Sequence, residues 1–483
     1  MRTRYLQELG IMSQNLEVKK YDRKVTGAER FFSHSPFSIV TMVARIKGNV
    51  TRDMLESAVT KVQQRHVLLR VRIREDETHV PWFTSEGIQE IPIEVFPRKS
   101  ESDWIEIHAN ASKIPYEFET QPAIRLILVQ SSEISELIIL CHHIICDGLS
   151  LAFLARDLMV YLGDPSREVE VLPDPEPINL DNLPSDVSLS SFVKYLINRI
   201  KRKWDDEIIF FDQEDYEILT KTYWDNYQHR LFSIELSEEQ TSALIERCRS
   251  KGITVNSAIT TAFSGAQSFV ANENHGHTKT AIAVSLRDRI PIHPGEAIGF
   301  YAMGFELKIK YDHRKDYWHN ARKIHEKIKS NFSNKKVFGM LPSYLQMDSN
   351  IYEALNFKKL GALVSPDLPR FKKLFDFSKR DDVVVRLLQR AKMETLKTKL
   401  LDSAITNLGR LDFPKTYGSL ELDRLIMQPG GAFPLVHVDM VIGVVTCSGK
   451  LSLVVEYAEE IADTATMQRI KDQALKYLVQ ELN

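Results

Sequence analysis

The sequence predicts an α/β protein built from two sandwich-like domains, and three observations lead to that prediction. The chain has 483 residues, more than one hydrophobic core usually accommodates, so two domains are expected. Apolar residues make up 43% of it and charged residues 27%, which is an ordinary globular balance. Segments with strand and helix periodicity alternate irregularly in both halves without a repeat, which favours two α/β sandwiches over one doubly wound sheet.

The first half of the chain reads as strands and helices that lead to one distinctive loop. Residues 36–49 are rich in β-branched side chains and predict a strand. Thr51 is the expected N-cap of a helix over Arg52–Arg65, where apolar residues recur at helical spacing. Three more strands and a closing helix are expected, over Leu68–Arg74, Ala123–Gln130 and Glu136–Cys141 and from Leu149 to about Leu162.

Recurrent prolines among acidic and small residues then indicate a linker. We place it at residues 166–188, between a domain of residues 1–165 and one of residues 189–483. The second half predicts helices over Ser190–Asp205, Glu238–Lys251, Val255–Ala271 and about Asp463–Glu481, strands over Arg230–Leu236 and Lys279–Ser285, a strand ending at Lys310, and a hairpin of 435–446 with 451–457.

Charge and cysteine content exclude several classes of protein. The net charge is -2 and the pI about 6.7, whereas nucleic-acid-binding domains are strongly basic. The four cysteines show no C-x-x-C spacing and resemble buried apolar residues, which favours a reducing compartment. No window of about 18 residues is continuously apolar, so we expect no transmembrane segment and a cytoplasmic protein.

The most informative stretch is Cys141–Gly148, which follows an apolar strand and precedes a helix. Histidine takes a proton near neutral pH, so His142 and His143 are candidate bases. Adjacent residues of extended backbone point to opposite faces, so one ring faces a cavity and the other is packed. This disfavours a metal site built from His142, His143 and Asp147, and we predict none. The alternative reading is two satisfied core histidines followed by a capping aspartate.

The stretch matches His-His-x-x-x-Asp-Gly and resembles the condensation-domain and acyltransferase superfamily, which shares the chloramphenicol acetyltransferase fold. The resemblance implies two acetyltransferase-like domains arranged as a V, with a substrate tunnel between them. It implies that His143 is the catalytic base and that His142 supports the loop. It also implies that Asp147 forms a structural ion pair with Arg287, which lies in a segment similar to the family's Leu-Arg-x-Arg. Gly148 has no Cβ, so it lets the turn form and leaves the tunnel clear.

The resemblance extends over nearly the whole chain, including residues 26–33 and 64–70. Ile298–Tyr301 and Thr406–Gly409 resemble family segments near the channel, which makes Gly299, Tyr301, Thr406 and Asn407 candidates for the tunnel wall. Thr406-Asn407 is equally readable as an ordinary polar turn. The Asp-Phe-Gly-Trp-Gly motif of plant-type acyltransferases is missing, and the pattern is closest to free-standing polyketide-associated and alcohol acyltransferases.

The expected function is therefore transfer of an acyl group from a thioester to a hydroxyl or amine acceptor. No Gly-x-Ser-x-Gly elbow is found, so no covalent acyl-enzyme is expected. We expect no permanently bound cofactor; acyl-CoA or a phosphopantetheinyl carrier protein serves as co-substrate. The alternatives are a stand-alone condensation enzyme of nonribosomal peptide or polyketide biosynthesis, a condensation-like epimerase or cyclase, and a non-catalytic docking protein.

Basic residues concentrate in residues 370–399. This segment is either a solvated helix face or a surface for an acidic carrier protein, a lipid or the phosphates of a coenzyme.

Overall fold

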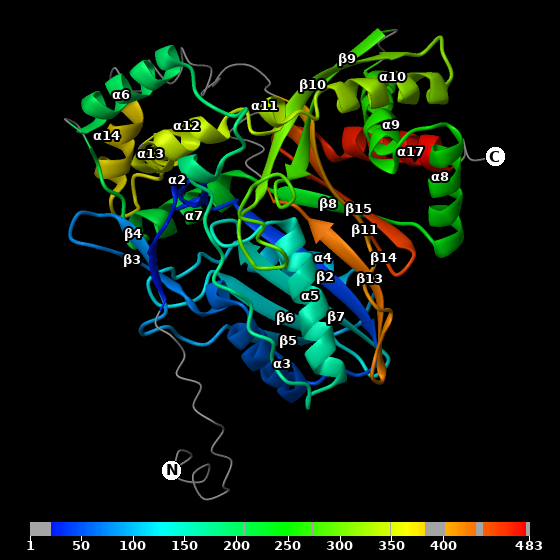
Figure 1. Cartoon of the computed structure of the whole chain (residues 1–483), viewed down its shortest axis with the longest axis horizontal. Helices are drawn as coiled ribbons and strands as arrows, with labels where there is room; N and C mark the ends of the chain where they lie inside the picture. Colours follow the sequence, from blue (N-terminus) through cyan, green and yellow to red (C-terminus); the bar gives the residue numbers. More distant parts are fainter. Residues whose placement is uncertain are drawn as a thin grey trace, which may run out of the picture.

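Two mixed β-sheets form the framework of the protein, as the computed structural model in Figure 1 shows. The structure describes residues 21–205, 208–271, 275–347, 349–381, 401–430 and 438–479. Each of the two sheets has six strands, and helices pack against both. The predicted α/β class with two sheet-and-helix units is confirmed.

The first sheet has the strand order β12-β13-β2-β7-β6-β5. Helix α5 packs against β2, β7 and β13, and α3 packs on α5. Because this sheet is covered, β2 and β7 are buried along almost their whole length instead of alternating with polar residues. The elements are β2 (Ile39–Lys47), α3 (Arg52–Arg65), β5 (Ile93–Pro97), α4 (Asp103–Ala111), β6 (Ile124–Gln130), β7 (Ile134–His142), α5 (Gly148–Gly163), β12 (Thr416–Tyr417) and β13 (Leu420–Gln428).

The second sheet has the order β10-β9-β11-β14-β15-β8. Helix α9 lies along β9, β10 and β11, and α10 and α17 pack on α9. The elements are β8 (His229–Glu235), α8 (Glu238–Ser250), α9 (Val255–Val270), β9 (His275–Ser285), β10 (Ala302–Asp312), α10 (Tyr317–Ser330), β11 (Leu401–Leu411), β14 (Val438–Cys447), β15 (Lys450–Ala458) and α17 (Thr464–Val479).

A separate group of helices lies beside the two sheets, at the upper left of Figure 1. Its apolar side chains form a hydrophobic cluster of their own, centred on Phe357 and Leu374. The remaining elements are α2 (Gly27–Arg30), α6 (Ser191–Asp205), α7 (Gln213–Asn226), α11 (Asn334–Val337), α12 (Leu341–Gln346), α13 (Ser349–Gly361) and α14 (Phe371–Lys379), a small sheet of β1 (Asp22–Lys24), β3 (Arg72–Glu75) and β4 (Pro81–Thr84), and the short 3₁₀ turns Val67–Arg70 and Leu180–Asn182.

Most of the predicted elements are present, and one is wrong. Helix α3 spans the predicted residues, and Thr51 caps it by accepting a hydrogen bond from the Met54 amide at 3.3 Å. The predicted strand Leu68–Arg74 is instead a 3₁₀ turn followed by β3, because Val67, Leu68 and Leu69 are all buried and do not alternate. Residues 435–437 of the predicted hairpin and 480–481 of the terminal helix lie outside the described residues.

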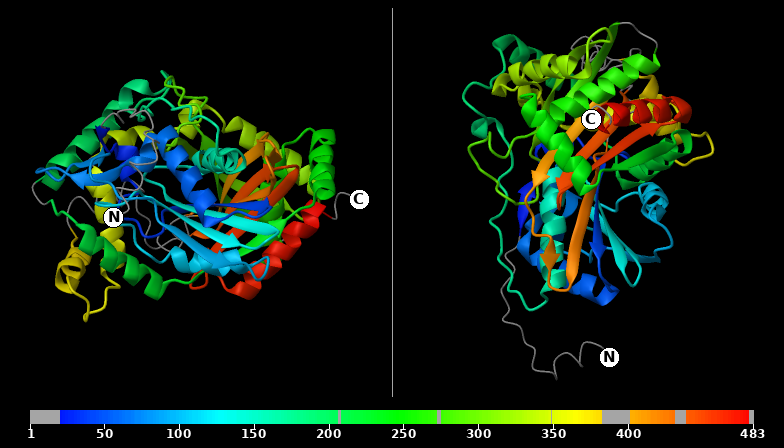
Figure 2. Two further views of the ribbon diagram at one scale, coloured as in Figure 1. Left: turned by 90° about the horizontal axis from the view of Figure 1, so that it is seen from below. Right: turned by 90° about the vertical axis from the view of Figure 1, so that its right-hand side faces the viewer.

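The two sheets do not follow the predicted division of the chain. Strands β12 and β13 belong to the second half in sequence, yet β13 pairs antiparallel with β2, Leu425 lying opposite Ala44. In the side view of Figure 2, the orange strands run down beside the blue and cyan strands of the first half. The boundaries at 165 and 189 stay a prediction, but residues 416–428 pack with the first domain.

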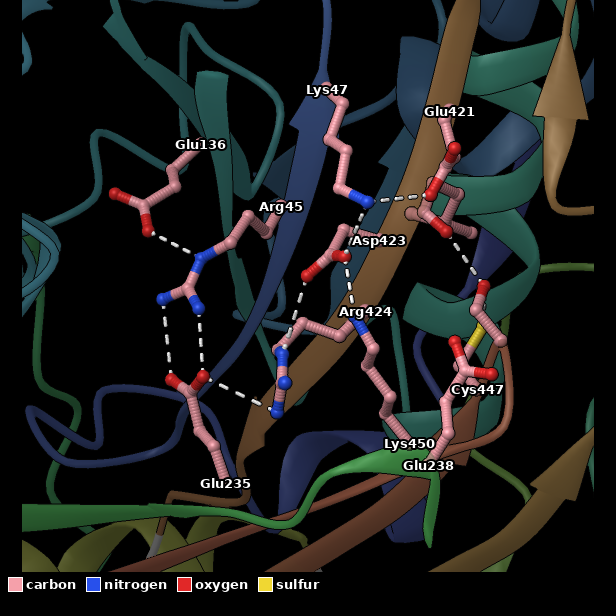
Figure 3. A network of polar contacts seen from close by, with 12 residues as sticks. Arg45, Lys47, Glu136, Glu235, Glu238, Glu421, Asp423, Arg424, Cys447 and Lys450 are labelled. Carbon is pink, nitrogen blue, oxygen red and sulfur yellow. Dashed lines mark hydrogen bonds and ion pairs between the residues drawn. The ribbon is translucent and has the colours of Figure 1, made fainter. Parts of the chain in front are cut away.

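Buried charges join the two sheets where β2, β7 and β13 meet β8 and β15, as Figure 3 shows. Arg45 donates to Glu136 Oε1 at 2.9 Å and to Glu235 Oε2 at 2.7 Å, and Arg424 Nη1 lies 3.2 Å from Glu235. We call the six residues of this network the sheet seam: Arg45, Glu136, Glu235, Asp423, Arg424 and Lys450.

Candidate active site

The two histidines lie where β7 ends and the chain turns into α5. His142 is the last residue of β7, pairing with Ile39, and the His143 amide donates to the Ser38 carbonyl at 2.8 Å. The loop therefore starts from a central strand of the first sheet that is buried along almost its whole length. This placement holds both rings on a rigid element, as a reactive group requires.

His142 is completely buried and is held as a neutral ring. Its Nε2 donates to the Ser35 carbonyl at 3.2 Å, and its Nδ1 accepts from the Ile144 amide at 3.3 Å. A protonated ring would point an N–H at the Ile144 amide, which is itself a donor. Burial lowers the pKa of His142 to about 3, opposed by the hydrogen bond to Ser35. His142 therefore stabilises the loop and is sealed from substrate.

His143 faces a cavity, and its surroundings fix its tautomer. The ring Nδ1 donates to the Cys146 carbonyl at 3.0 Å. A neutral imidazole that carries its hydrogen on Nδ1 has its basic lone pair on Nε2. Phe32 stacks on the ring at 4.7 Å between centroids, and Phe300 meets it edge-on at 5.7 Å. Burial lowers the pKa of His143, opposed by the Cys146 carbonyl, the charge of Asp147 and the Pro429 carbonyl, so the neutral ring prevails at neutral pH.

Asp147 turns away from His143 and anchors the loop to the second half of the chain. It is the N-cap of α5, accepting from the Ser150 amide at 2.7 Å. Its other oxygen accepts from the Tyr301 amide at 3.0 Å, and Arg287 Nη2 lies 3.3 Å from Oδ1. Arg287 also donates to the carbonyls of Gly295 and Ala297 at 2.8 and 2.9 Å. We call Asp147, Ser150, Arg287 and the Tyr301 amide the Asp147 anchor.

A cavity of about 370 Å³ opens in front of His143, and both halves of the chain line it. Its wall is mostly apolar, which excludes water and strengthens electrostatic interactions inside. Met427, Pro429 and Gly430 come from the crossing strand β13 and the residues after it. The other described lining residues are Ala28, Phe31, Phe32, Val40, His143, Asp147, Gly148, Ala283, Phe300, Ala302, Met303, Leu341, Tyr344, Ala404, Thr406, Val438 and Val441.

The structure divides the four predicted tunnel residues, together with the supporting Gly148, into two groups. Thr406 and Gly148 line the cavity. A Cβ on Gly148 would lie 2.9 Å from Met427 Sδ, so this position needs space; its φ is not positive, and the turn itself does not require glycine.

Gly299, Tyr301 and Asn407 are not among the residues that line this cavity, so their place in the tunnel wall stays a prediction. The Gly299 amide donates to Ser150 Oγ at 3.2 Å, while the Tyr301 ring lies 4.9 Å from the Arg287 guanidinium. Both residues thus support the Asp147 anchor from behind. Their neighbours Phe300 and Ala302 line the cavity instead, because successive residues of extended chain face opposite sides.

The same alternation separates Asn407 from Thr406. Asn407 faces a second, larger cavity of about 960 Å³, where its amide donates to Asn256 at 3.4 Å. Ala283 lines both cavities, so they adjoin.

Sequence reasoning missed several residues that shape the site. Phe32 lies in the segment 26–33 that the resemblance had marked, but nothing in the sequence showed that its ring stacks on His143. Ser150 Oγ lies 2.8 Å from Arg287 Nη2, Asp147 Oδ1 and the Gly299 carbonyl. Its spacing from Asp147, D-x-x-S before a helix, was a capping signal that would have found it.

Two further findings concern the described residues as a whole. Within them, no three side chains of histidine, cysteine, aspartate or glutamate gather as metal ligands would. None of the helices in the described ranges combines the length and apolarity needed to cross a bilayer.

Comparisons with known proteins show that the chain is an acyltransferase. A family model described as alcohol acetyltransferase matches residues 98–362, and one described as condensation domain matches residues 22–170. Because the first match covers more than half of the chain, the protein belongs to the alcohol acetyltransferase family.

Solved structures of this architecture share the fold at low identity. TRI3 trichothecene 15-O-acetyltransferase from Fusarium sporotrichioides is 12% identical with a TM-score of 0.62, covering 97% of this chain and 96% of that one. Polyketide synthase associated protein 5 from Mycobacterium tuberculosis is 15% identical with a TM-score of 0.57, covering 95% and 98%. The epimerization domain of tyrocidine synthetase B is 13% identical with a TM-score of 0.57, covering 96% and 97%. At these identities the likeness shows the fold alone.

Curated relatives match over a shorter stretch. The nonribosomal peptide synthetase agiA of Aspergillus flavus is 32% identical over 122 residues, which is 24% of this chain. The hybrid PKS-NRPS synthetase LUC5 of Fusarium sp is 34% identical over 128 residues, or 26% of this chain. The matches span only 2% and 3% of the length of those synthetases.

Proposed function

We propose that the protein transfers an acyl group from a coenzyme A or carrier-protein thioester to a hydroxyl or amine, with His143 as general base. The observation that carries this proposal is the hydrogen bond from His143 Nδ1 to the Cys146 carbonyl, which directs the basic lone pair to Nε2 in a cavity-facing ring. In that form the ring accepts a proton from an attacking nucleophile.

The proposed reaction needs one proton carrier and no covalent enzyme intermediate. Nε2 removes the proton as the acceptor oxygen or nitrogen bonds to the thioester carbonyl carbon. The carbon–sulfur bond then breaks, and the leaving thiolate takes the proton from the imidazolium of His143. The imidazolium and the main-chain N–H groups at the amino end of α5, where Gly148 lines the cavity, oppose the oxyanion charge.

The nearby thiols support a mechanism without an acyl-cysteine. Cys141 and Cys146 are fully buried, and burial raises the pKa of the Cys146 thiol well above its ordinary value. A protonated, sealed thiol is a poor nucleophile. Among the described residues that line the cavity there is no serine or cysteine.

A second candidate is a stand-alone condensation enzyme in nonribosomal peptide or polyketide biosynthesis, which joins acyl and amino groups on carrier proteins. The match of a condensation-domain model to residues 22–170 and the similarity to synthetases favour it. A cytoplasmic location fits either candidate, since all four cysteines are free and buried.

Product analysis tests the proposal directly. The full chain is incubated with acyl-CoA or an acyl carrier protein and with alcohols or amines, and thiol release and product mass are followed. His143→Ala should lower the rate by about 10²–10⁴-fold, the usual contribution of a positioned base. His277→Ala is the matched control, since His277 is exposed on β9.

The outcomes distinguish the candidates. An ester or amide product that depends on His143 supports transfer, and the preferred donor separates coenzyme A from carrier-protein enzymes. Turnover in His143→Ala equal to wild type would remove the proposed base. An epimerised substrate, or no product with any donor, would favour a condensation-like epimerase or a docking protein.

A further inference from the structure

Helix α6 has two distinct faces, and the outer one carries large aromatic side chains in solvent. Ile197, Ile200 and Trp204 are buried and attach the helix to the peripheral hydrophobic cluster. On the opposite face, Phe192 is 72% exposed and Tyr195 is 58% exposed. Isolated exposed apolar residues are common on surfaces, but these two are three residues apart and therefore neighbours on one face.

The outer face continues as a row of positive charge. Arg199 and Arg202 follow Tyr195 at spacings of four and three residues, so they extend the same stripe along the helix, and both are exposed. Lys194, Lys201 and Lys203 flank the stripe. The acidic residues come only at the end of the helix, with Asp205 and, next in sequence, Asp206 and Glu207.

These cations differ from those of the neighbouring helix α14. Arg370 pairs with Asp212 and Glu214, and Lys373 pairs with Asp215, so carboxylates of α7 neutralise that part of the basic segment 370–399. The part over residues 382–399 lies outside the described residues. Among the described residues, no carboxylate forms an ion pair with the basic side chains of α6. Figure 1 places α6 at the outer edge of the molecule, beyond α13 and α14.

We propose that α6 is a membrane-surface contact, which docks the protein on an anionic bilayer through Phe192 and Tyr195 with the basic stripe beside them. Aromatic rings prefer the boundary between headgroups and acyl chains, and lysine and arginine are attracted to anionic lipid. A protein partner with acidic side chains is the competing occupant, and the vesicle experiment below separates the two. The binding is peripheral and reversible, because only two rings are available to insert.

Vesicle co-sedimentation of the full chain tests this proposal. The probes are phosphatidylcholine vesicles and vesicles of phosphatidylcholine with phosphatidylserine. We expect binding to the anionic vesicles only. This binding should weaken as the salt concentration rises, because the Debye length becomes shorter. Arg199→Gln with Arg202→Gln should weaken binding roughly fivefold for each charge, or about 30-fold together. Phe192→Ser with Tyr195→Ser should lower it by at least tenfold.

Matched controls keep the test specific. Phe269→Ser removes another ring, which is 52% exposed on α9, and Arg322→Gln with Lys323→Gln removes two exposed cations from α10. These variants should bind like wild type, and all variants should keep the wild-type unfolding midpoint because the changed side chains are exposed. Absence of vesicle binding, equal loss in the control variants, or capture by an acidic carrier protein without vesicle binding would overturn the proposal.

Discussion

Buried charges from both halves of the chain meet at the Asp147 anchor and at the sheet seam, but their partners differ in kind. Asp147 is held by main-chain amides of Ser150 and Tyr301 as well as by Arg287. In the sheet seam, side chains are bound mainly to other side chains, and Arg45 shares Glu136 and Glu235. The anchor is therefore one ion pair in a fixed cradle of main-chain groups, whereas the sheet seam is a set of exchangeable pairs.

The comparison indicates where the protein tolerates change. The main-chain amides that hold Asp147 cannot adopt a new rotamer. Removing Asp147 also leaves Arg287 buried without a carboxylate partner among the described residues. In the sheet seam, Arg45 and Arg424 each keep a second carboxylate when one is lost, whereas Arg98, which also contacts Glu136, lies outside this set. We expect mutations in the anchor to cost more stability than equivalent mutations in the sheet seam.

The largest effect should come from breaking the anchor. Asp147→Asn and Arg287→Met should each destabilise the fold by about 3–5 kcal/mol, because each leaves an uncompensated buried charge. The double variant should cost much less than the sum, as the shared interaction is lost only once. Urea midpoints measure all three. Additive costs, or a lower rate in Asp147→Asn with an unchanged midpoint, would contradict a structural role.

Glu136→Gln provides the matching test in the sheet seam. Glu136 is fully buried, but Arg45 keeps its contact with Glu235 in this variant. Burial also raises the pKa of Glu136, opposed by Arg45 and Arg98, so loss of the charge relieves part of the desolvation cost but also removes the carboxylate that Arg98 contacts. We expect a loss of about 1.5–3 kcal/mol by the same urea measurement. A cost equal to that of Asp147→Asn would remove the distinction between the two regions.

Acid should lower the stability of the fold, because His142, at the start of the loop before α5, is buried as a neutral ring. Its pKa is about 3 in the fold, well below the ordinary 6.5, because of burial. Between these values the unfolded chain binds a proton that the folded chain does not, so stability falls as pH drops below about 6.5 and is insensitive to His142 above it. The slope from one histidine is at most about 1.4 kcal/mol per pH unit. His142→Gln should flatten the stability profile between pH 6 and 4.5, and parallel profiles would exclude this assignment.

The smallest effect is expected at the edge of the sheet seam. Glu235 retains 25% exposure of its side chain, so water partly replaces its ion pairs. Glu235→Gln should cost about 1 kcal/mol or less, and the cost should shrink in high salt. Thermal unfolding at low and high salt checks this, with Lys221→Gln on α7 as an exposed control. A loss of stability as large as that of Glu136→Gln would show that the cost of removing a carboxylate from the sheet seam does not depend on its burial.

Part of the fold and of the site was predictable because it is encoded locally. Helix α3 follows from a capping threonine and helical spacing, and the loop of His143, Asp147 and Gly148 follows from one short motif. The pairing of Asp147 with Arg287 came from resemblance, and the structure brings the two side chains together.

The rest depends on contacts that a single sequence does not reveal. Whether Phe300 or Tyr301 faces the cavity is decided by one residue of strand register, which sequence alone does not fix. The stacking of Phe32 on His143 joins a segment before β2 to the end of β7. The pairing of β13 with β2 brings together residues near opposite ends of the chain.

The pairing of β13 with β2 also constrains when the first sheet can fold during synthesis of the chain. Thr41 leaves the ribosome first, and its strand partner Gln428 follows only after the intervening residues 42–427. Until then β2 pairs on one side only, with β7, and its other edge is open to unwanted strand partners. The first sheet therefore cannot close domain by domain as translation proceeds, and its completion must wait until β13 has been made.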